Sequence, residues 1–479
     1  MKRRSQKNLK NPNRRKFLGA STAGLAAAAI TPTVLAQSNS EVADPNHYDV
    51  IVIGAGFAGV TAARDASWLG HKTLILEARP RLGGRCFTSS FGGHSDVDFG
   101  GKWVGWSQPH VWAEIMRYGI EVDESAALAR ATNQIWMENG QRVDGDPAQY
   151  GAMFDHGANV FYEPSREAFP RPFDPLFNQE HQELDSISAA EALADMDLEP
   201  TIKDLMTSFT AINGHSDPSE SSYYDQLRWF SLSNFSLVNM WDNVGRYRIK
   251  GGTKTLIEAM QESSNAELKL ANPVSSISQD ENGVTVNTRR NETYTAKAVI
   301  LALPLNCVAD IEFSPAISET KIRVSQERHT GSGTKVYARI EADQPVMSGH
   351  GTIDMPLNFI WTEYDDPESH ILVGFGTSPS TLDINNNDAV SDAVQRYLPD
   401  AQLIESFGYD WNLDPYSKGT WCMYRPNVFT QDFEELRQAE GRLHFAGGDI
   451  ALGWRGFIDG AIETGMTTAK AVHEQISQA

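Results

Sequence analysis

The chain has 479 residues, of which 41% are hydrophobic and 22% charged, and its formal net charge is −21. Such a length accommodates two or three domains with sizeable cores, and the acidic balance argues against nucleic acid and anionic membranes as partners. The three cysteines are an odd number without any C-x-x-C pair, which argues against a disulfide framework. The histidines are scattered without ligand spacing, so we predict no metal site.

The N-terminus has the features of an export signal. Arg14-Arg15-Lys16-Phe17-Leu18 resembles the twin-arginine consensus, although Asn13 replaces the usual Ser or Thr and Gly19 the usual Lys. A mildly apolar stretch follows and ends in Val34-Leu35-Ala36, which fits a small-residue cleavage site. The alternative is a transmembrane anchor, which the many Ala, Gly and Thr residues and Pro32 disfavour.

Removal of residues 1–36 would make the protein more acidic, because this segment contains eight Lys or Arg and no Asp or Glu. Taking eight positive charges from −21 leaves −29. No apolar tail follows Lys470, so we expect no C-terminal membrane anchor. The mature protein is therefore expected to be periplasmic, exported by the twin-arginine route.

A nucleotide-binding unit begins with the apolar run Asp49 to Ile53, which has the length of a buried strand. A G-x-G-x-x-G sequence and an alanine-rich helix follow directly. The first glycine allows a tight turn, the second lets the backbone approach a pyrophosphate, and the third permits close helix–strand packing. The helix N-terminus offers free N–H groups to phosphates. The residues of this turn predicted to bind the cofactor are Gly54, Gly56, Phe57, Ala58 and Gly59.

Thr73 to Leu76 forms the second predicted strand, and Glu77 at its end is placed to accept ribose hydroxyls. A lone glycine motif would often be only a turn, but strand, glycines, helix, strand and acid in this order predict dinucleotide binding. The adjacent Ala78 and Arg79 join the predicted cofactor site.

Arg81-Leu-Gly83-Gly84-Arg85 resembles the R-x-G-G-R segment that follows the ribose acid in FAD-dependent amine oxidases. Gly84 lets the backbone pass near the diphosphate, and Arg85 neutralises part of its charge. A solvated basic turn is the alternative interpretation.

Asp98-Phe-Gly-Gly101-Lys-Trp103-Val-Gly105 resembles the D-x-G-G-x-(Y/W)-V-G segment that runs beside the isoalloxazine ring in the same family. The resemblance implies that the backbone at Gly101 approaches the ring and that Trp103 covers it. Further along, Val111, Trp112, Ile115 and Met116 fall on one face of a predicted core-facing helix.

We expect the chain then to return to the first domain. Ser188-x-x-Glu191 predicts a capping box, and Gly251-Gly252 precedes a helical run. A strand from Ala298 to Leu303 comes next. Family members bring the residue that matches Val274 near the adenine, although a plain β-hairpin explains this stretch equally well.

Thr334 to Ile340 predicts a strand, with Lys335 on the face opposite Val336. Periodicity alone would make Lys335 a solvent-facing lysine. The stretch Gly331 to Val336 resembles the family strand whose lysine reaches a water near flavin N5, and this resemblance implies a catalytic role for Lys335.

Tyr416-Ser-Lys-Gly-Thr420-Trp421 resembles the Y-S-G-G-C-Y segment of monoamine oxidases, in which the cysteine bonds the flavin and the final aromatic residue forms a cage wall. Thr420 stands at the cysteine position, so non-covalent FAD is expected, with Trp421 as the wall. Phe457 matches the second cage position, although it could be an ordinary core aromatic. Gly448, Asp449 and Ile458 complete the predicted cofactor site, and Asp449 is expected to hydrogen-bond the ribityl or diphosphate part.

The chain thus resembles the flavin monoamine oxidase family over residues 48–472. The stretch Trp106 to Glu114 and the loop Phe169-Pro-Arg-Pro172 look most like its exported bacterial branch, which includes nicotine and pseudooxynicotine oxidoreductases. The resemblance implies an α/β fold with a Rossmann-like FAD-binding domain and a discontinuous α+β substrate-binding domain of the amine oxidase type. We assign residues 46–105, 245–315 and 435–476 to the former and residues 106–244 and 316–434 to the latter.

The implied reaction is oxidation of an amine by hydride transfer from its α-carbon to flavin N5, after which water hydrolyses the imine. Oxygen or a periplasmic cytochrome c is the expected electron acceptor. Whether the protein forms a homodimer is left open. An L-amino acid oxidase is an alternative, but it needs a cation for the substrate carboxylate, and no Arg lies between Arg85 and Arg117. A flavin-binding protein without turnover is the second alternative.

Overall fold

The structure is a computed structural model that describes residues 45–125 and 133–478. The export signal predicted for residues 1–36 lies outside these residues and stays a prediction. Within the described ranges, no helix is both long and apolar enough to cross a membrane.

The first large sheet carries the glycine-rich turn. Its strands are β1 (His47–Ile53), β2 (Thr73–Leu76), β10 (Glu267–Lys269), β11 (Val274–Gln279), β12 (Val284–Thr288), β13 (Thr293–Leu301), β14 (Glu312–Ser314) and β20 (Leu443–Phe445). Their order is β10-β2-β1-β13-β12-β11-β14, and β20 pairs with β13. β1 runs parallel to β2 and β13, and the apolar residues of β1 and β2 are buried on both faces, as the continuous hydrophobic runs predict.

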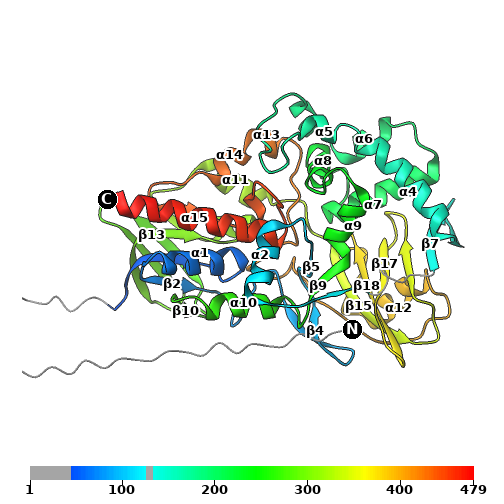
Figure 1. The fold of residues 1–479 in the computed structure, drawn as a ribbon, viewed down its shortest axis with the longest axis horizontal. Coiled ribbons are helices and arrows are strands. Elements are labelled where there is room, and N and C mark those ends of the chain that lie inside the picture. The colour runs from blue at the N-terminus through cyan, green and yellow to red at the C-terminus, as the bar shows by residue number, and fades with distance from the viewer. Residues whose placement is uncertain (1–44, 126–132, 479) are drawn as a thin grey trace, which may run out of the picture. The chain divides into compact units, whose positions relative to one another are not determined.

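Helices α1 (Phe57–Trp68) and α15 (Ile458–Gln478) lie side by side against this sheet, although they come from opposite ends of the sequence (Figure 1). Gly465 makes their close approach feasible, because a Cβ there would lie 2.4 Å from Ala58 O. α10 (Thr253–Glu262) also packs on α1. The C-terminal helix thereby holds the N-terminal end of α1, which follows the glycine-rich turn.

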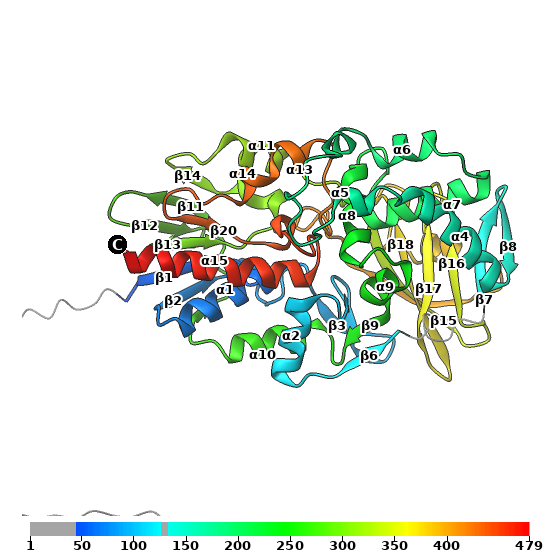
Figure 2. The ribbon, with the colours of Figure 1, turned by 45° about the horizontal axis from the view of Figure 1, so that its top comes forward.

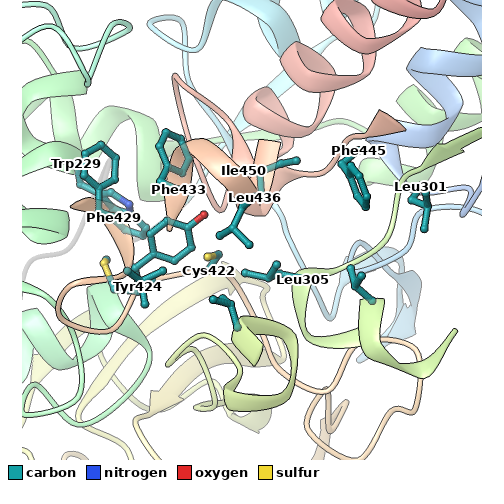
Figure 3. Close-up of a cluster of buried hydrophobic side chains, with 14 of the residues drawn as sticks. Trp229, Leu301, Leu305, Cys422, Tyr424, Phe429, Phe433, Leu436, Phe445 and Ile450 are labelled. Atoms are coloured by element: carbon teal, nitrogen blue, oxygen red, sulfur yellow. The ribbon is translucent and has the colours of Figure 1, made fainter. Parts of the chain in front are cut away.

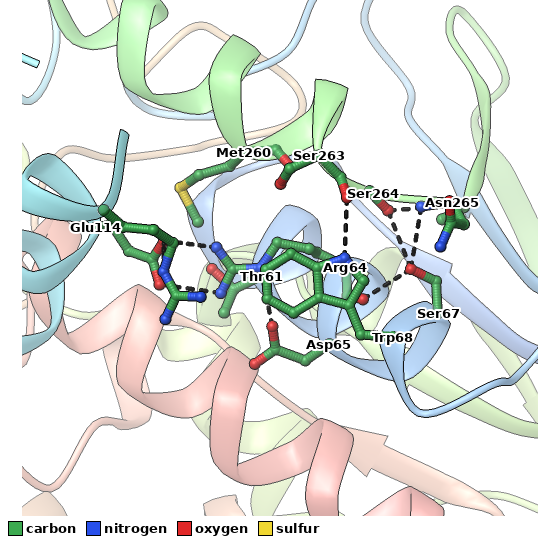
Figure 4. Close-up of polar contacts among 12 residues, drawn as sticks. Thr61, Arg64, Asp65, Ser67, Trp68, Glu114, Met260, Ser263, Ser264 and Asn265 are labelled. Atoms are coloured by element: carbon green, nitrogen blue, oxygen red, sulfur yellow. Dashed lines mark hydrogen bonds and ion pairs between the residues drawn. The ribbon is translucent and has the colours of Figure 1, made fainter. Parts of the chain in front are cut away.

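A buried ion pair fixes α1 to α2 (Pro109–Tyr118). The guanidinium of Arg64 donates to both carboxylate oxygens of Glu114 at 2.6 and 3.0 Å, and Trp68 Nε1 donates to Ser263 O (Figure 4). The helix predicted at α2 is confirmed, with its Val111 and Ile115 buried, but the prediction that Met116 faces the core is wrong. Met116 is 68% exposed, because it lies at the edge of a narrow buried stripe.

The second large sheet consists of β7 (Asn133–Glu138), β8 (Gln141–Gly145), β15 (Thr334–Glu341), β16 (Met347–His350), β17 (Phe359–Asp365), β18 (Ser369–Gly376) and β19 (Leu403–Gly408), in the order β19-β15-β18-β17-β16-β7-β8. Helices α4 (Pro147–Phe161) and α7 (Pro200–Gly214) lie beside it (Figure 2). α12 (Asn387–Gln395) packs against Val336 and its neighbours on β15. On the other face of β15, Tyr337 packs among Phe91, Val97 and Phe99, so both faces of the strand are covered.

Smaller elements connect the two sheets. The strands are β3 (Thr88–Phe91), β4 (His94–Asp98), β5 (Trp103–Val104), β6 (Val122–Glu124) and β9 (Tyr247–Ile249). The helices are α5 (Ser165–Ala168), α6 (Ala189–Asp195), α8 (Tyr223–Leu232), α9 (Leu237–Trp241), α11 (Glu319–Glu327), α13 (Val428–Gln431) and α14 (Phe433–Arg437), with 3-10 turns at Gln182–Ser186, Leu305–Asp310 and Gly448–Ile450 and a π-helical turn at Asp242–Arg246. The predicted capping box at Ser188 and Glu191 is confirmed at the start of α6.

One hydrophobic cluster joins the segment between Cys422 and Ile450 to α8 and to the end of β13 (Figure 3). Its aromatic members pack closely: the Phe429 and Phe433 rings are stacked at 4.9 Å between centroids. This packing fixes the segment that follows Trp421 against the first sheet.

The three segments assigned to a FAD-binding domain all contribute strands to the first sheet, and the two assigned to a substrate-binding domain supply the second sheet. The domain boundaries themselves stay predictions.

Candidate active site

A cavity of about 570 Å³ lies where the ends of β1 and β2 face the second sheet. Most residues singled out by the sequence contribute to its wall. These are Gly54, Gly56, Phe57, Ala58, Glu77, Ala78, Arg79, Gly84, Arg85, Gly101, Trp103, Val274, Lys335, Trp421, Gly448, Phe457 and Ile458. Two are absent from the wall, Gly59 and Asp449. The sequence motifs, spread over 400 residues, thus converge on one cavity.

The glycine-rich turn closes tightly at one end of this cavity. Gly54 has a φ of +101°, and a Cβ on it would lie 2.5 Å from Ala302 O. A Cβ on Gly59 would lie 1.9 Å from Gly54 O, so this residue serves the packing of helix against turn and does not need to reach the cavity. A Cβ on Gly56 would meet nothing nearer than 3.8 Å, which leaves its cavity side open.

The Glu77 carboxylate is held by the backbone. Its Oε2 accepts a hydrogen bond from Ala55 N at 2.6 Å, and its Oε1 accepts one from Arg79 N at 2.7 Å. The acid therefore sits at the mouth of the turn in a fixed orientation. The Arg79 guanidinium instead donates to Asp414 Oδ1 at 2.6 Å and to Ser417 Oγ at 2.8 Å. The Arg79 side chain therefore ties the second strand's end to the segment that leads to Trp421.

Asp449 lies behind the wall and supports Arg85. Its Oδ1 accepts from the Arg85 guanidinium at 2.6 Å, and its Oδ2 accepts from Leu305 N at 2.9 Å. Although burial opposes ionisation, Arg85 lowers the pKa of Asp449 below its ordinary value. Arg85 also donates to Thr420 O at 2.8 Å. Both carboxylate oxygens thus have partners within the protein, and the expected contact of Asp449 with the cofactor stays a prediction.

Lys335 lies on β15 and is buried, so the solvent-facing interpretation of its strand pattern is wrong. Its Nζ donates to Asp98 O at 2.8 Å and to Gly100 O at 2.9 Å, and it lies 4.7 Å from the centroid of the Trp103 ring. Burial and the neighbouring Lys102 lower the pKa of Lys335 to about 7. A lysine in this environment is largely neutral in mildly alkaline solution.

The neighbouring Lys102 is fully buried and keeps its charge. Its Nζ forms an ion pair with Glu363 Oε1 at 2.8 Å, and neither side chain is exposed. Burial alone would lower the pKa of Lys102, but the Glu363 carboxylate raises it above its ordinary value. Glu363 Oε2 also accepts from Trp361 Nε1 at 2.8 Å. One buried carboxylate thus compensates a buried cation and orients a cavity-lining indole.

The end of the cavity near Lys335 is aromatic. The Trp103 ring lies 5.3 Å from that of Trp361 between centroids, and Trp361 is stacked on Phe375. The side chains that share this character are Trp103, Trp229, Trp241, Phe209, Phe359, Trp361, Phe375, Trp421 and Phe457. Such rings supply a large apolar contact area.

Trp421 is fixed on two sides. Its Nε1 donates to Asn213 O at 2.7 Å, and its ring is stacked on His215, with centroids 3.9 Å apart and planes 4° apart. His215 Nε2 lies 3.1 Å from Thr334 O, an acceptor, so Nδ1 is left to accept from Thr420 Oγ1 at 2.8 Å. Burial lowers the pKa of His215 to about 3, so the ring is neutral. Phe457 packs on Trp229 at 4.8 Å between centroids.

The model of the flavin containing amine oxidoreductase family matches residues 57–473. The chain belongs to this family. Its cofactor is accordingly FAD, and it is an oxidoreductase that catalyses FAD-dependent oxidation of amines at a C–N bond.

Curated relatives match nearly the whole chain. A pseudooxynicotine dehydrogenase from Pseudomonas sp. is 42% identical over 468 residues, covering 95% of this chain and 94% of its own. A nicotine dehydrogenase from Pseudomonas putida is 34% identical and covers 97% of this chain and 98% of its own.

Solved structures share the fold. Putrescine oxidase bound to putrescine superimposes with a TM-score of 0.77 at 21% identity, covering 89% of this chain and 99% of its own. Cyclohexylamine oxidase from Brevibacterium oxydans gives a TM-score of 0.76 at 21% identity, covering 90% of this chain and 99% of its own. These confirm the α/β fold class of the amine oxidase type.

The donor set of the cavity fits FAD. The open backbone at Gly56, the carboxylate of Glu77 and the guanidinium of Arg85 would hold the nucleotide part, and Gly100 and Gly101 line the cavity wall before Trp103. The assignment of individual residues to FAD stays a prediction. Among residues 45–125 and 133–478, no group of His, Cys, Asp and Glu is placed to hold a metal ion.

Several cavity residues have no counterpart in the sequence analysis, namely Asn213, His215, Trp229 and Trp361, and neither does Glu363, the ion-pair partner of the cavity-lining Lys102. Asn213 and Trp229 lie on helices α7 and α8, and His215 directly follows α7. Trp361 and Glu363 lie on β17 of the second sheet, and no glycine motif marks any of these positions. Composition offered one signal, the high number of tryptophans, but not their positions.

Proposed function

We propose that this protein oxidises a neutral amine that carries an aromatic or bulky apolar group. The observation that carries this proposal is the lack of a free carboxylate at the cavity wall. Within the described chain, the acidic residues of the wall are Glu77, held by two backbone N–H groups, and Asp310, paired with Lys418 at 2.5 Å. A substrate ammonium group would find no anionic partner and would face Lys335.

The aromatic end supports a substrate with an extended apolar part. The rings of Trp421 and Phe457 would exclude water from the reacting carbon and orient the amine nitrogen between them. Bound FAD supplies the two-electron acceptor for the oxidation of the C–N bond. The names of two relatives, a pseudooxynicotine dehydrogenase and a nicotine dehydrogenase, support amines of this kind.

Lys335 would hold a water molecule near the reacting atoms. In its neutral form the amino group has two N–H donors and one lone pair. Asp98 O and Gly100 O accept hydrogen bonds from both donors, so the lone pair is left to accept a hydrogen bond from water. This arrangement suits the hydrolysis of an imine product or proton transfer during reoxidation.

We also propose export by the twin-arginine route to the periplasm, with a cytochrome c or oxygen as electron acceptor. Twin-arginine export carries folded proteins, which suits a chain that takes up its flavin in the cytoplasm. The negative charge of the chain would attract a basic cytochrome.

An anaerobic screen tests the substrate class. We expect 4-phenylbutylamines with a primary or secondary amino group, or pseudooxynicotine, to bleach the flavin absorbance of the purified holoenzyme, and short polyamines and amino acids to bleach it far more slowly. Readmission of oxygen or of a basic cytochrome c then identifies the acceptor. Bleaching by amino acids alone would sink the proposal, and so would a flavin that no amine reduces.

Thr420 offers no thiol to the flavin, and its hydroxyl is bonded to His215, so we propose that FAD is bound non-covalently. Acid precipitation of the holoenzyme is expected to leave essentially all flavin in the supernatant and none in the pellet. Yellow colour retained by the precipitated protein, seen in its absorbance spectrum after redissolving, would contradict this.

A further inference from the structure

The end of helix α7 presents an amide group to the aromatic end of the cavity. Asn213 is 4% exposed and lines the cavity. Its Nδ2 donates to Tyr162 OH at 3.2 Å and to Gln226 Oε1 at 3.3 Å, which uses both of its hydrogens. In the described part of the chain, no donor is bonded to its Oδ1.

The orientation of this amide is set by its neighbour. Gln226 Nε2 donates to Thr210 O at 2.9 Å, so Gln226 turns its oxygen toward Asn213. If Asn213 pointed its oxygen toward Gln226, two oxygens would face each other. The amide nitrogen of Asn213 must therefore point toward Gln226 Oε1. Asn213 Oδ1 is thus left without a donor. It does not belong to the side-chain N and O atoms that are both fully buried and unpaired, so it retains some accessible surface. Since Asn213 lines the cavity, this oxygen is open to it.

The position of Asn213 links this oxygen to the proposed substrate. Its own backbone oxygen accepts from Trp421 Nε1 at 2.7 Å, so the amide sits beside the indole that forms one wall. The lysines at this end, Lys335 and Lys102, are already bonded to backbone oxygens and to Glu363. A buried acceptor without a donor is costly, and a bound molecule with an N–H group would satisfy it.

We propose that Asn213 Oδ1 accepts the N–H of the bound amine and thereby selects primary and secondary amines over tertiary ones. This inference rests on the proposed function. A tertiary amine in its neutral form has no N–H to donate, so it would leave the acceptor unpaired and place a methyl group against it.

A matched pair of amines tests the proposal. N-methyl-4-phenylbutylamine retains one N–H, whereas N,N-dimethyl-4-phenylbutylamine has none in its neutral form. Anaerobic stopped-flow measurement of flavin reduction gives the limiting rate and apparent Kd for each. In Asn213→Leu we expect the preference for the secondary amine, as the ratio of rate over Kd, to fall about three- to tenfold, the range a neutral hydrogen bond provides.

A control variant makes the result specific. Thr207→Val, on the same helix, removes a hydroxyl that bonds only to Lys203 O within the helix, and it should leave both amines unchanged. Because the two amines are compared in one variant, a general disturbance of Trp421 cancels from the ratio.

The outcomes separate the two proposals. Reduction of the wild-type flavin by neither amine overturns the proposed function and this inference with it. Reduction of the wild type together with an unchanged ratio in Asn213→Leu overturns the role of Asn213 alone.

Discussion

Replacement of Lys335 by Met is expected to slow one flavin half-reaction by about 100-fold while FAD remains bound. Methionine matches the length of the lysine stem but has no lone pair of comparable basicity and no donor for Asp98 O and Gly100 O. Stopped-flow measurement of anaerobic reduction and of reoxidation separates the two half-reactions. The flavin content per chain, measured on the same samples, shows whether binding is intact.

The pH dependence gives this prediction a second readout. Burial and the neighbouring Lys102 lower the pKa of Lys335 to about 7, so the fraction of neutral amine rises as the pH rises through this value. The affected step in the wild type should therefore accelerate between pH 6 and 8, about one unit on either side of that pKa. Lys335→Met should lack this rise. Two half-reactions that keep their wild-type rates in the variant would refute the role of Lys335.

Local patterns in the sequence were sufficient to predict the glycine-rich turn and the acid that line one end of the cavity. The spacing of Gly54, Gly56 and Gly59 and the position of Glu77 depend on one strand–helix–strand unit. Glu77 accordingly bonds to Ala55 N and Arg79 N, which belong to the same unit or directly follow it. The family resemblance supplied what local pattern could not, above all the burial of Lys335, which periodicity alone places in solvent.

The partners that fix the substrate end were beyond the reach of sequence patterns. His215 and Thr420 are 205 positions apart, and the buried partner of Lys102 lies on a strand of the other sheet. Neither pairing has a spacing rule, because it arises from packing of segments whose mutual placement no local propensity encodes. Asp449 shows a related limit: its motif places it near the cofactor, but its hydrogen bonds to Arg85 and Leu305 depend on tertiary contacts.

The largest stability effect is expected from Glu363→Ala, which should lower the free energy of unfolding by about 3–5 kcal/mol. The variant leaves the ammonium group of Lys102 buried without its counter-ion, and it removes the acceptor for Trp361 Nε1. Urea titration at saturating FAD, followed by tryptophan fluorescence, measures the change. The surface pair of Lys250 and Glu121 provides the matched control, since Glu121→Ala should shift the transition little.

A double variant distinguishes charge from packing in this loss. Glu363→Leu combined with Lys102→Met removes both charges and roughly preserves the buried volume, so most of the stability lost in Glu363→Ala should return. The pKa of Lys335 should then rise, because the lost repulsion by Lys102 outweighs the lost attraction by Glu363. The pH-dependent step of flavin reaction would accordingly move to higher pH in the double variant. Recovery of stability without that movement would mean that the ion pair serves the fold and leaves the ionisation of Lys335 untouched.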